Sequence, residues 1–171
     1  MKNLILILIF VSISSILRAQ NLQSLDSAQY FDFWVGEWTA SWDEGNGVQK
    51  LGTNTITRSL DDKVIVENFR IVEGQSKGFK GMSMSVFQPR FNRWKQAWSD
   101  NQGGYFDFEG RFDGEKRIFQ TQVVKRGEKK VQQRMIFYNI TEKSMTWDWE
   151  SSIDGGESWT LQWRIFYNKV Q

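Results

Sequence analysis

Residues 33–43 read Phe-Trp-Val-Gly-Glu-Trp-Thr-Ala-Ser-Trp-Asp, and the three tryptophans in this stretch are spaced by four residues. Side chains alternate between the two faces of a β-strand, so an even spacing places all three indoles on one face. The same even spacing recurs in the pairs Trp94/Trp98, Trp147/Trp149 and Trp159/Trp163. The pattern predicts strands with one aromatic face at the start, in the middle and near the end of the chain.

Ten segments alternate between apolar and polar residues and are separated by short turns rich in Gly, Asn and Asp. They are 36–43, 48–58, 63–72, 80–88, 93–100, 104–112, 117–125, 130–140, 143–152 and 157–168. Connections this short join antiparallel neighbours. Closing such a meander removes its unpaired edges and leaves a bore wider than that of eight strands. We therefore predict an all-β fold, an antiparallel up-and-down barrel of about ten strands with an internal cavity.

A short helix is expected before the first strand, over residues 23–33. Ser24 or Asp26 can cap its start, and Leu25, Ala28 and Phe31 follow at helical spacing.

The chain contains no histidine and no cysteine. This composition excludes Ser-His-Asp triads, thiolate nucleophiles, zinc held by His or Cys, and haem held by His. It also excludes disulfides. Acids, tyrosines and arginines are the side chains left for catalysis, and we expect no cofactor and no metal.

The first nineteen residues resemble a secretory signal. Lys2 gives a basic start, residues 4–11 are apolar, and Ala19 is a small residue suited to cleavage before Gln20. We expect residues 1–19 to be removed, leaving one domain over residues 20–171 that is exported to the periplasm or the extracellular space. No later segment approaches the length of a membrane span.

Net charge also bears on partners. The whole chain has 22 Lys+Arg and 20 Asp+Glu; Lys2 and Arg18 leave with the signal, so 20 bases face 20 acids. A neutral chain argues against nucleic acid as a partner. The basic cluster at 125–130 contains Gly127, which favours a solvated hairpin tip over an anion site.

Gly36-Glu37-Trp38 together with Arg164 on the last predicted strand resembles the lipocalin (calycin) signature. The wider pattern is similar to an uncharacterised bacterial family of secreted lipocalin-like domains, the domain of unknown function 1579. It comprises residues 33–38, Gly52-Thr53-Asn54, Val66-Glu67-Asn68, Phe87-Gln88-Pro89, Trp94, Trp98-Ser99-Asp100 and Glu109-Gly110. The resemblance implies the fold and no activity. It also implies that Trp38 and Arg164 touch where the first and last strands meet.

The segment Ser152-Ile153-Asp154-Gly155-Gly156-Glu157-Ser158-Trp159 resembles the Asp-box of sialidases and other β-propellers. A sialidase needs several such boxes, an arginine cluster and a longer chain. The short polar side chains and glycines of one box are suited to a tight turn, so we predict a structural role.

Candidate ligand-binding residues are the polar and aromatic side chains on the central and late strands, although the pattern does not decide which face of each strand is interior. They are Glu67, Trp94, Gln96, Trp98, Glu109, Arg134, Trp147 and Trp149. Glu67, Glu109 and Arg134 are also candidates for one buried polar cluster, but we favour a solvated outer face for them because charges are rarely buried without a partner.

Three functions fit this sequence. We favour non-catalytic binding of a small apolar or aromatic molecule inside the barrel. The alternatives are a His-independent enzyme, such as a cyclase, isomerase or hydrolase using Glu, Asp, Tyr or Arg, and a surface module that binds glycan or protein. An interior acid with a raised pKa would favour the enzyme. A dry, apolar barrel lining would favour non-catalytic binding, and a row of tryptophans on the outside would favour the surface module.

Overall fold

The computed structural model describes residues 26–171 with the exception of residue 46. The expected signal segment and the start of the expected helix lie outside the described residues. In the described part the chain forms eleven strands, separated mostly by short turns. They are β1 (Gly36–Asp43), β2 (Gln49–Ser59), β3 (Val64–Ile71), β4 (Lys80–Gln88), β5 (Arg93–Asp100), β6 (Tyr105–Asp113), β7 (Lys116–Thr121), β8 (Val124–Arg126), β9 (Lys129–Tyr138), β10 (Ser144–Ser152) and β11 (Thr160–Lys169).

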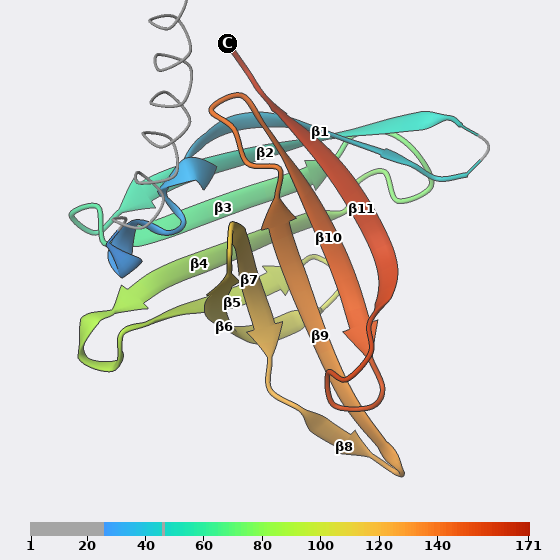
Figure 1. Cartoon of the computed structure of the whole chain (residues 1–171). Helices are drawn as coiled ribbons and strands as arrows, with labels where there is room; N and C mark the ends of the chain where they lie inside the picture. The colour runs from blue at the N-terminus through green and yellow to red at the C-terminus, as the bar shows by residue number, and fades with distance from the viewer. Residues whose placement is uncertain (1–25, 46) are drawn as a thin grey trace, which may run out of the picture.

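Ten of these strands close into a barrel (Figure 1). Neighbours in sequence pair in antiparallel fashion from β1 to β7, β7 pairs with β9, and β9 pairs with β10. The ring closes where β11 pairs with both β10 and β1. The predicted closed antiparallel barrel is thus confirmed.

The seventh predicted strand, 117–125, is divided in two by residues 122–123. Its second part, β8, pairs only with β9, and this hairpin extends beyond the barrel (Figure 1). Gly127 has φ +60° at the tip, between exposed basic residues, so the basic cluster does form a hairpin tip.

The short N-terminal helix is present as two 3₁₀ turns, η1 (Ser27–Gln29) and η2 (Asp32–Trp34). The Asp26 side chain caps η1 by accepting a hydrogen bond from the backbone N–H of Ala28. Two tight turns form here in place of one longer helix because the side chains of Phe31 and Trp34 are buried in the end of the barrel.

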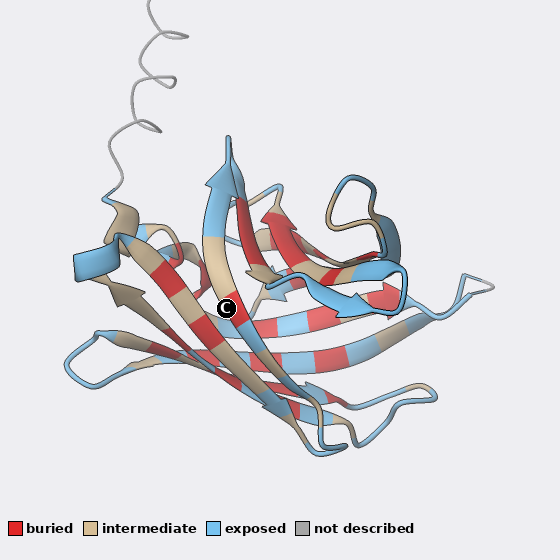
Figure 2. Ribbon diagram, turned by 90° about the horizontal axis from the view of Figure 1, so that it is seen from below, coloured by how far each residue is buried: buried red, intermediate tan, exposed pale blue. Residues whose placement is uncertain are grey.

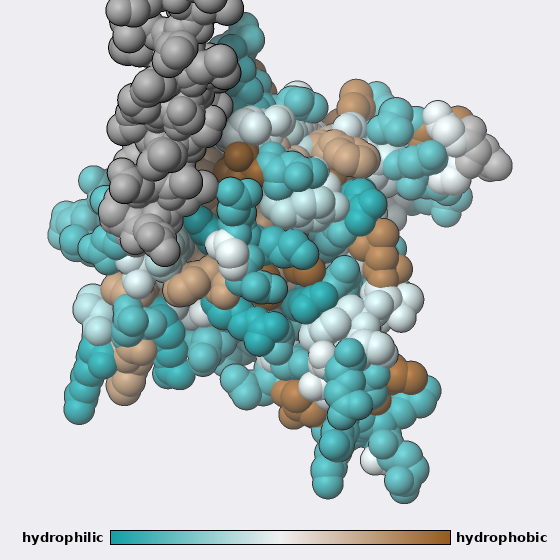
Figure 3. All heavy atoms as spheres, viewed as in Figure 1, coloured by the Kyte–Doolittle hydropathy of each residue, from teal (hydrophilic) through white to brown (hydrophobic). Residues whose placement is uncertain are grey.

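Buried and exposed residues alternate along the strands, as Figure 2 shows. In β2, for example, Gly52, Asn54 and Ile56 are buried while their neighbours on the strand are exposed or half-buried. The inner face of the barrel is therefore the core. The face in Figure 3 is mostly hydrophilic, with scattered hydrophobic groups. No helix within the described residues is long and apolar enough to cross a membrane.

Candidate functional site

The N-terminal segment closes one end of the barrel. Phe31 is 0% exposed, and its ring stacks on Phe119 at 4.3 Å and meets the edge of Trp94 at 5.2 Å. Trp34 and Trp38 are buried beside it, and the Trp38 Nε1 donates to the carbonyl oxygen of Trp34 at 2.8 Å. We call this filled part of the interior the closed half.

Cationic side chains from the strands hold the segment in place. Arg117 donates to the carbonyl oxygen of Tyr30 at 3.1 Å, and Lys169 Nζ donates to that of Val35 at 3.0 Å. A third contact is an ion pair between Arg58 and Asp32. The segment is therefore fixed by charge at the rim and by aromatic packing inside.

The other half of the interior is hollow and opens to solvent, and we call it the open half. Its cavity has a volume of about 170 Å³. The residues around it are mostly aromatic: Glu67, Phe69, Phe79, Trp98, Asp100, Phe106, Phe108, Met135, Trp147, Trp149, Trp163, Ile165 and Tyr167.

The indoles of the open half form one connected wall. Trp147 and Trp149 are nearly parallel with ring centroids 6.4 Å apart, as expected for residues two apart on one face of β10. Trp163 on β11 meets the edge of Trp147 at 5.8 Å, and Phe106 on β6 meets Trp149 at 5.4 Å. Such edge-to-face and stacked pairs restrain one another, so the wall is preformed.

Trp98 completes this wall from β5, and a glycine makes room for it. A Cβ added to Gly81 on β4 would lie 2.0 Å from Trp98 Cζ2, so any side chain at position 81 would displace the indole. The Trp98 Nε1 donates to Asp100 Oδ2 at 3.3 Å.

Polar residues lie where the two halves meet. Glu67 is 6% exposed and accepts two hydrogen bonds of 2.7 Å, from Asn54 Nδ2 on β2 and from Ser83 Oγ on β4. Burial raises the pKa of Glu67 to about 7, and the two hydrogen bonds oppose this rise only in part. Burial, with the nearby Glu67, also raises the pKa of Tyr167 well above its ordinary value.

Asp100 lies at the mouth of the cavity in a different setting. Its Oδ1 accepts from the backbone N–H groups of Gly104 at 2.8 Å and Gln102 at 2.9 Å. Partial burial acts to raise its pKa, but these bonds and that from Trp98 outweigh it, so the pKa lies below its usual value. The carboxylate at the mouth is therefore ionised at neutral pH.

Four of the eight candidate residues line the cavity: Glu67, Trp98, Trp147 and Trp149. Trp94 and Gln96 are also inside the barrel but nearer the closed half. Trp94 Nε1 donates to the carbonyl oxygen of Ser27 at 2.8 Å, and Gln96 Nε2 donates to Ser85 Oγ at 2.9 Å. These two side chains therefore lie beneath the inner end of the cavity, which we call its floor, and are not part of its aromatic wall.

Glu109 and Arg134 lie on the outer face in separate ion pairs. Glu109 accepts from Arg93 at 2.9 Å, and Arg134 donates to Glu150 Oε2 at 2.7 Å. The candidate cluster with Glu67 is therefore not formed, because Phe108 and Met135, which neighbour these residues on their strands, point inward. Both residues lie on the outer face, as we favoured from the sequence, but the Arg134 side chain is only 17% exposed because it is covered by Glu150 and Trp159.

The expected contact between Trp38 and Arg164 is wrong. Arg164 lies between the inward Trp163 and Ile165 and so points outward, where it donates to both oxygens of Asp148 at 2.7 Å. The cation over Trp38 is Lys169, with Nζ 5.2 Å from the ring centroid. Gly36, with φ +144°, lies against the same lysine, and a Cβ there would be 2.5 Å from Lys169 Cε.

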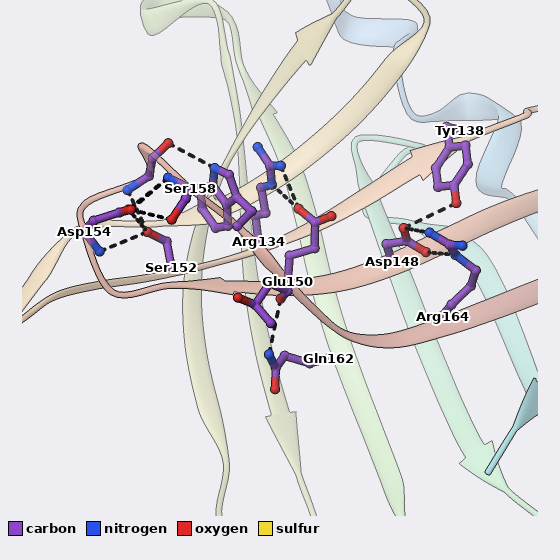
Figure 4. Close-up of polar contacts among 12 residues, drawn as sticks. Arg134, Tyr138, Asp148, Glu150, Ser152, Asp154, Ser158, Gln162 and Arg164 are labelled. Atoms are coloured by element: carbon purple, nitrogen blue, oxygen red, sulfur yellow. Dashed lines mark hydrogen bonds and ion pairs between the residues drawn. The ribbon is translucent and has the colours of Figure 1, made fainter. Parts of the chain in front are cut away.

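The Asp-box forms a turn between β10 and β11 (Figure 4). Ser152 Oγ donates to Asp154 Oδ1 at 2.6 Å and accepts from the backbone N–H of Gly156 at 2.8 Å. The Asp154 carboxylate also accepts from the N–H groups of residues 157 and 158 and from the Ser158 hydroxyl. The bonds from the Ser152 and Ser158 hydroxyls, followed by those from the backbone, hold the pKa of Asp154 well below the ordinary range. Trp159 packs under Arg134, whose guanidinium carbon is 3.9 Å from the ring centroid.

The site also contains residues that were not candidates from the sequence, namely Tyr167, Asn54, Ser83 and several aromatics of the wall. Alternation could have identified Tyr167, since Trp163, Ile165 and Tyr167 occupy every second position of the last strand. No local signal marks Asn54 or Ser83, because their role depends on the pairing of β2 and β4 with β3.

The arrangement offers an aromatic cavity with one carboxyl group at its floor and one at its mouth. Such a site can bind a small molecule and can exchange a proton with it at Glu67. Among the residues that the structure describes, no group of three acidic side chains is placed to hold a metal ion.

Comparison with known proteins supports the fold. The crystal structure of Rv2717c from M. tuberculosis is similar, with a TM-score of 0.55 and 10% sequence identity over 86% of this chain and 99% of that chain. At this identity the likeness shows a lipocalin-like barrel and carries no activity. No protein family model matches the sequence, and no curated protein matches it either.

Proposed function

We propose that this protein binds a small, largely apolar or aromatic molecule in the open half of the barrel without transforming it. The observation that carries the proposal is the cavity itself, with four indoles and four phenyl rings around a volume of about 170 Å³. An apolar protein cavity of roughly 150 Å³ holds a molecule the size of benzene. The open mouth lets a longer ligand extend toward solvent.

The expected affinity follows from apolar contact. A ligand that covers several indole faces in a preformed pocket is expected to bind with a Kd in the micromolar range, about −8 kcal/mol. Salt is expected to change the affinity for an uncharged ligand very little, because screening acts on charges.

The test is a fluorescence titration with N-phenyl-1-naphthylamine, which is apolar and uncharged. Binding in the cavity should quench the indole emission and saturate at micromolar probe. Trp149→Ala should weaken binding at least about tenfold, because it removes part of the wall. Trp159→Ala is the matched control, since that indole lies outside the cavity. No saturable binding, or equal effects of the two variants, would contradict the proposal.

A second candidate is supported by one observation, the buried Glu67 with a pKa of about 7. A carboxyl group that titrates near neutral pH is suited to general acid or base catalysis, and Tyr167 lies in the same cavity. This would be a His-independent cyclase, isomerase or hydrolase. Recovery of a chemically altered ligand after incubation with the wild-type protein, but not with Glu67→Gln, would favour it over simple binding.

The third function, a surface module that binds glycan or protein, depended on a row of tryptophans on the outside of the barrel. None of the nine tryptophans is exposed, so no row of indoles is presented for stacking on a glycan.

We also propose that the chain is exported after removal of residues 1–19 and belongs with the secreted lipocalin-like domains that it resembles. The apolar run at 4–11 and the small Ala19 support export. Mass spectrometry of the N-terminus in the native host should find Gln20 first; an intact Met1 or Lys2 would contradict it.

A further inference from the structure

The charges of the cavity point to a particular ligand class. We infer that the ligand carries a positive charge, as an amine or quaternary ammonium group on a small apolar or aromatic framework. This inference rests on the proposed binding function and names its ligand.

The first argument is the sign of the charges around the cavity. Two lining residues are acids, Glu67 at the floor and Asp100 at the mouth, and among the described residues no lysine or arginine lines the cavity. Inside an apolar enclosure an uncompensated charge is felt more strongly than in water. An anionic ligand would therefore be repelled, and a cation would find the compensating charge.

The second argument is the chemistry of the wall. Indole rings carry negative charge on their faces and attract a cation within about 6 Å of the ring centroid. Trp147 and Trp149 present parallel faces, and Trp98 and Trp163 lie on the same cavity. Such aromatic cages are the usual means by which proteins bind methylated ammonium groups.

The third argument is the state of Glu67. Its carboxyl group already accepts from Asn54 and Ser83, so one polar neighbour stands at each oxygen, but neither neighbour carries a charge. A carboxylate has about four acceptor sites, so each oxygen can still face a ligand. A bound cation would supply the missing positive partner that a buried carboxylate needs.

The inference makes binding depend on pH. The groups that titrate around Glu67 are Tyr167 from β11 and Asp100 from β5, which share its cavity, whereas the neighbours on β2 and β4 do not titrate. Asp100 is ionised and Tyr167 neutral across the neutral range. Binding of a cation should therefore strengthen as pH rises through about 7, where Glu67 ionises.

The experiment compares phenyltrimethylammonium with tert-butylbenzene, its uncharged isostere, and with benzoate. Calorimetric titrations of the full mature protein at about pH 8.5 should give at least about tenfold tighter binding of the cation than of the isostere, and no detectable binding of benzoate. At about pH 5.5 the cation should bind about tenfold more weakly, while the isostere should not change. Binding the cation near pH 7 should release protons.

Two variants locate the effect. Glu67→Gln should remove the preference for the cation and its pH dependence. Glu109→Gln, which loses an equal charge on the outer face, should keep both. If Glu67→Gln does not fold, the pH dependence in the unaltered protein decides.

Each outcome separates the two claims. If tert-butylbenzene binds as well as or better than the cation at both pH values, the cationic ligand is rejected and the proposed binding function stands. If benzoate binds best, the charge argument is overturned. If none of the three binds and the naphthylamine probe also fails, the binding function falls with it.

Discussion

The two halves of the barrel follow the same strand alternation and yet have opposite interiors. In the closed half the side chains of Phe31 and Trp34 enter from the segment before the first strand and fill the bore. These two side chains are 0% and 1% exposed, respectively. In the open half no such segment enters among the described residues, and the aromatic side chains of the wall face one another across a cavity of about 170 Å³. Ten strands make a bore wider than their own side chains fill, so the N-terminal segment determines which half is solid.

The difference also concerns charge. At the closed end cations hold the segment by its carbonyl oxygens, with Arg117 on Tyr30 and Lys169 on Val35. The open half holds two carboxyl groups and aromatic faces instead. The filled end therefore contributes packing that stabilises the fold, whereas the hollow end offers the cavity in which we propose that a ligand binds, and variants in the two halves should separate stability from binding.

The largest effect is expected from Phe31→Ala. Removing a fully buried ring that contacts Phe119 and Trp94 should lower the free energy of unfolding by about 3–5 kcal/mol. Urea denaturation measures it. The affinity of the folded variant for N-phenyl-1-naphthylamine should stay unchanged, because Phe31 does not line the cavity. Weaker probe binding by fully folded protein would show that the two halves are coupled.

Glu67→Gln should stabilise the protein at high pH. A carboxyl group with an ordinary pKa of 4.5 in the unfolded chain and about 7 in the folded one binds its proton more tightly when folded. Wild-type stability should therefore fall by about 3 kcal/mol as pH rises from 4.5 to about 7. The variant should lack this fall, so its advantage should be full above pH 7 and absent below pH 4.5. Equal pH profiles for the two proteins would contradict the raised pKa.

Strand alternation made most of the fold predictable. The strand boundaries and the closed antiparallel order follow from apolar residues at every second position and from short turns. The break between β7 and β8 was missed because residues 117–125 contain no Gly, Pro, Asn or Asp to mark the point where pairing in the barrel ends. We expected one helix before the first strand because the spacing of apolar residues there is helical. Two 3₁₀ turns form instead, because the tertiary contacts of Phe31 and Trp34 override this local preference.

The site was predictable only where alternation fixes a side. Trp98, Trp147 and Trp149 line the cavity as candidates, but Glu109 lies outside because Phe108 beside it is inside. The same rule could have corrected the expected contact of Arg164 with Trp38, because Arg164 lies between two inward residues, Trp163 and Ile165. The support of Glu67 by Asn54 and Ser83 depends on register between strands, and one sequence does not contain that register.

A smaller effect is expected from Lys169→Met. The variant loses the hydrogen bond to Val35 and the cation over Trp38, which together should cost about 1–2 kcal/mol. A double-mutant cycle with Trp38→Phe should show coupling. The same cycle with Arg164→Met should be additive, because Arg164 pairs with Asp148 on the outer face. Coupling of Trp38 to Arg164 rather than to Lys169 would restore the contact implied by the lipocalin signature.

The smallest effect is expected at the rim of the open half, from Asp154→Ala. The carboxylate orders the turn by accepting from backbone N–H groups, yet it is only half-buried and lies outside the hydrophobic core, so the melting temperature should fall less than in the other destabilised variants. Because the pKa of Asp154 is lowered on folding, its contribution is complete above the ordinary value of 3.8 and is lost as pH falls further. Thermal unfolding across this range should show the wild type and variant converge in acid. Probe affinity should not change, since the turn lies outside the cavity; a folded variant that lost binding would make the Asp-box part of the site.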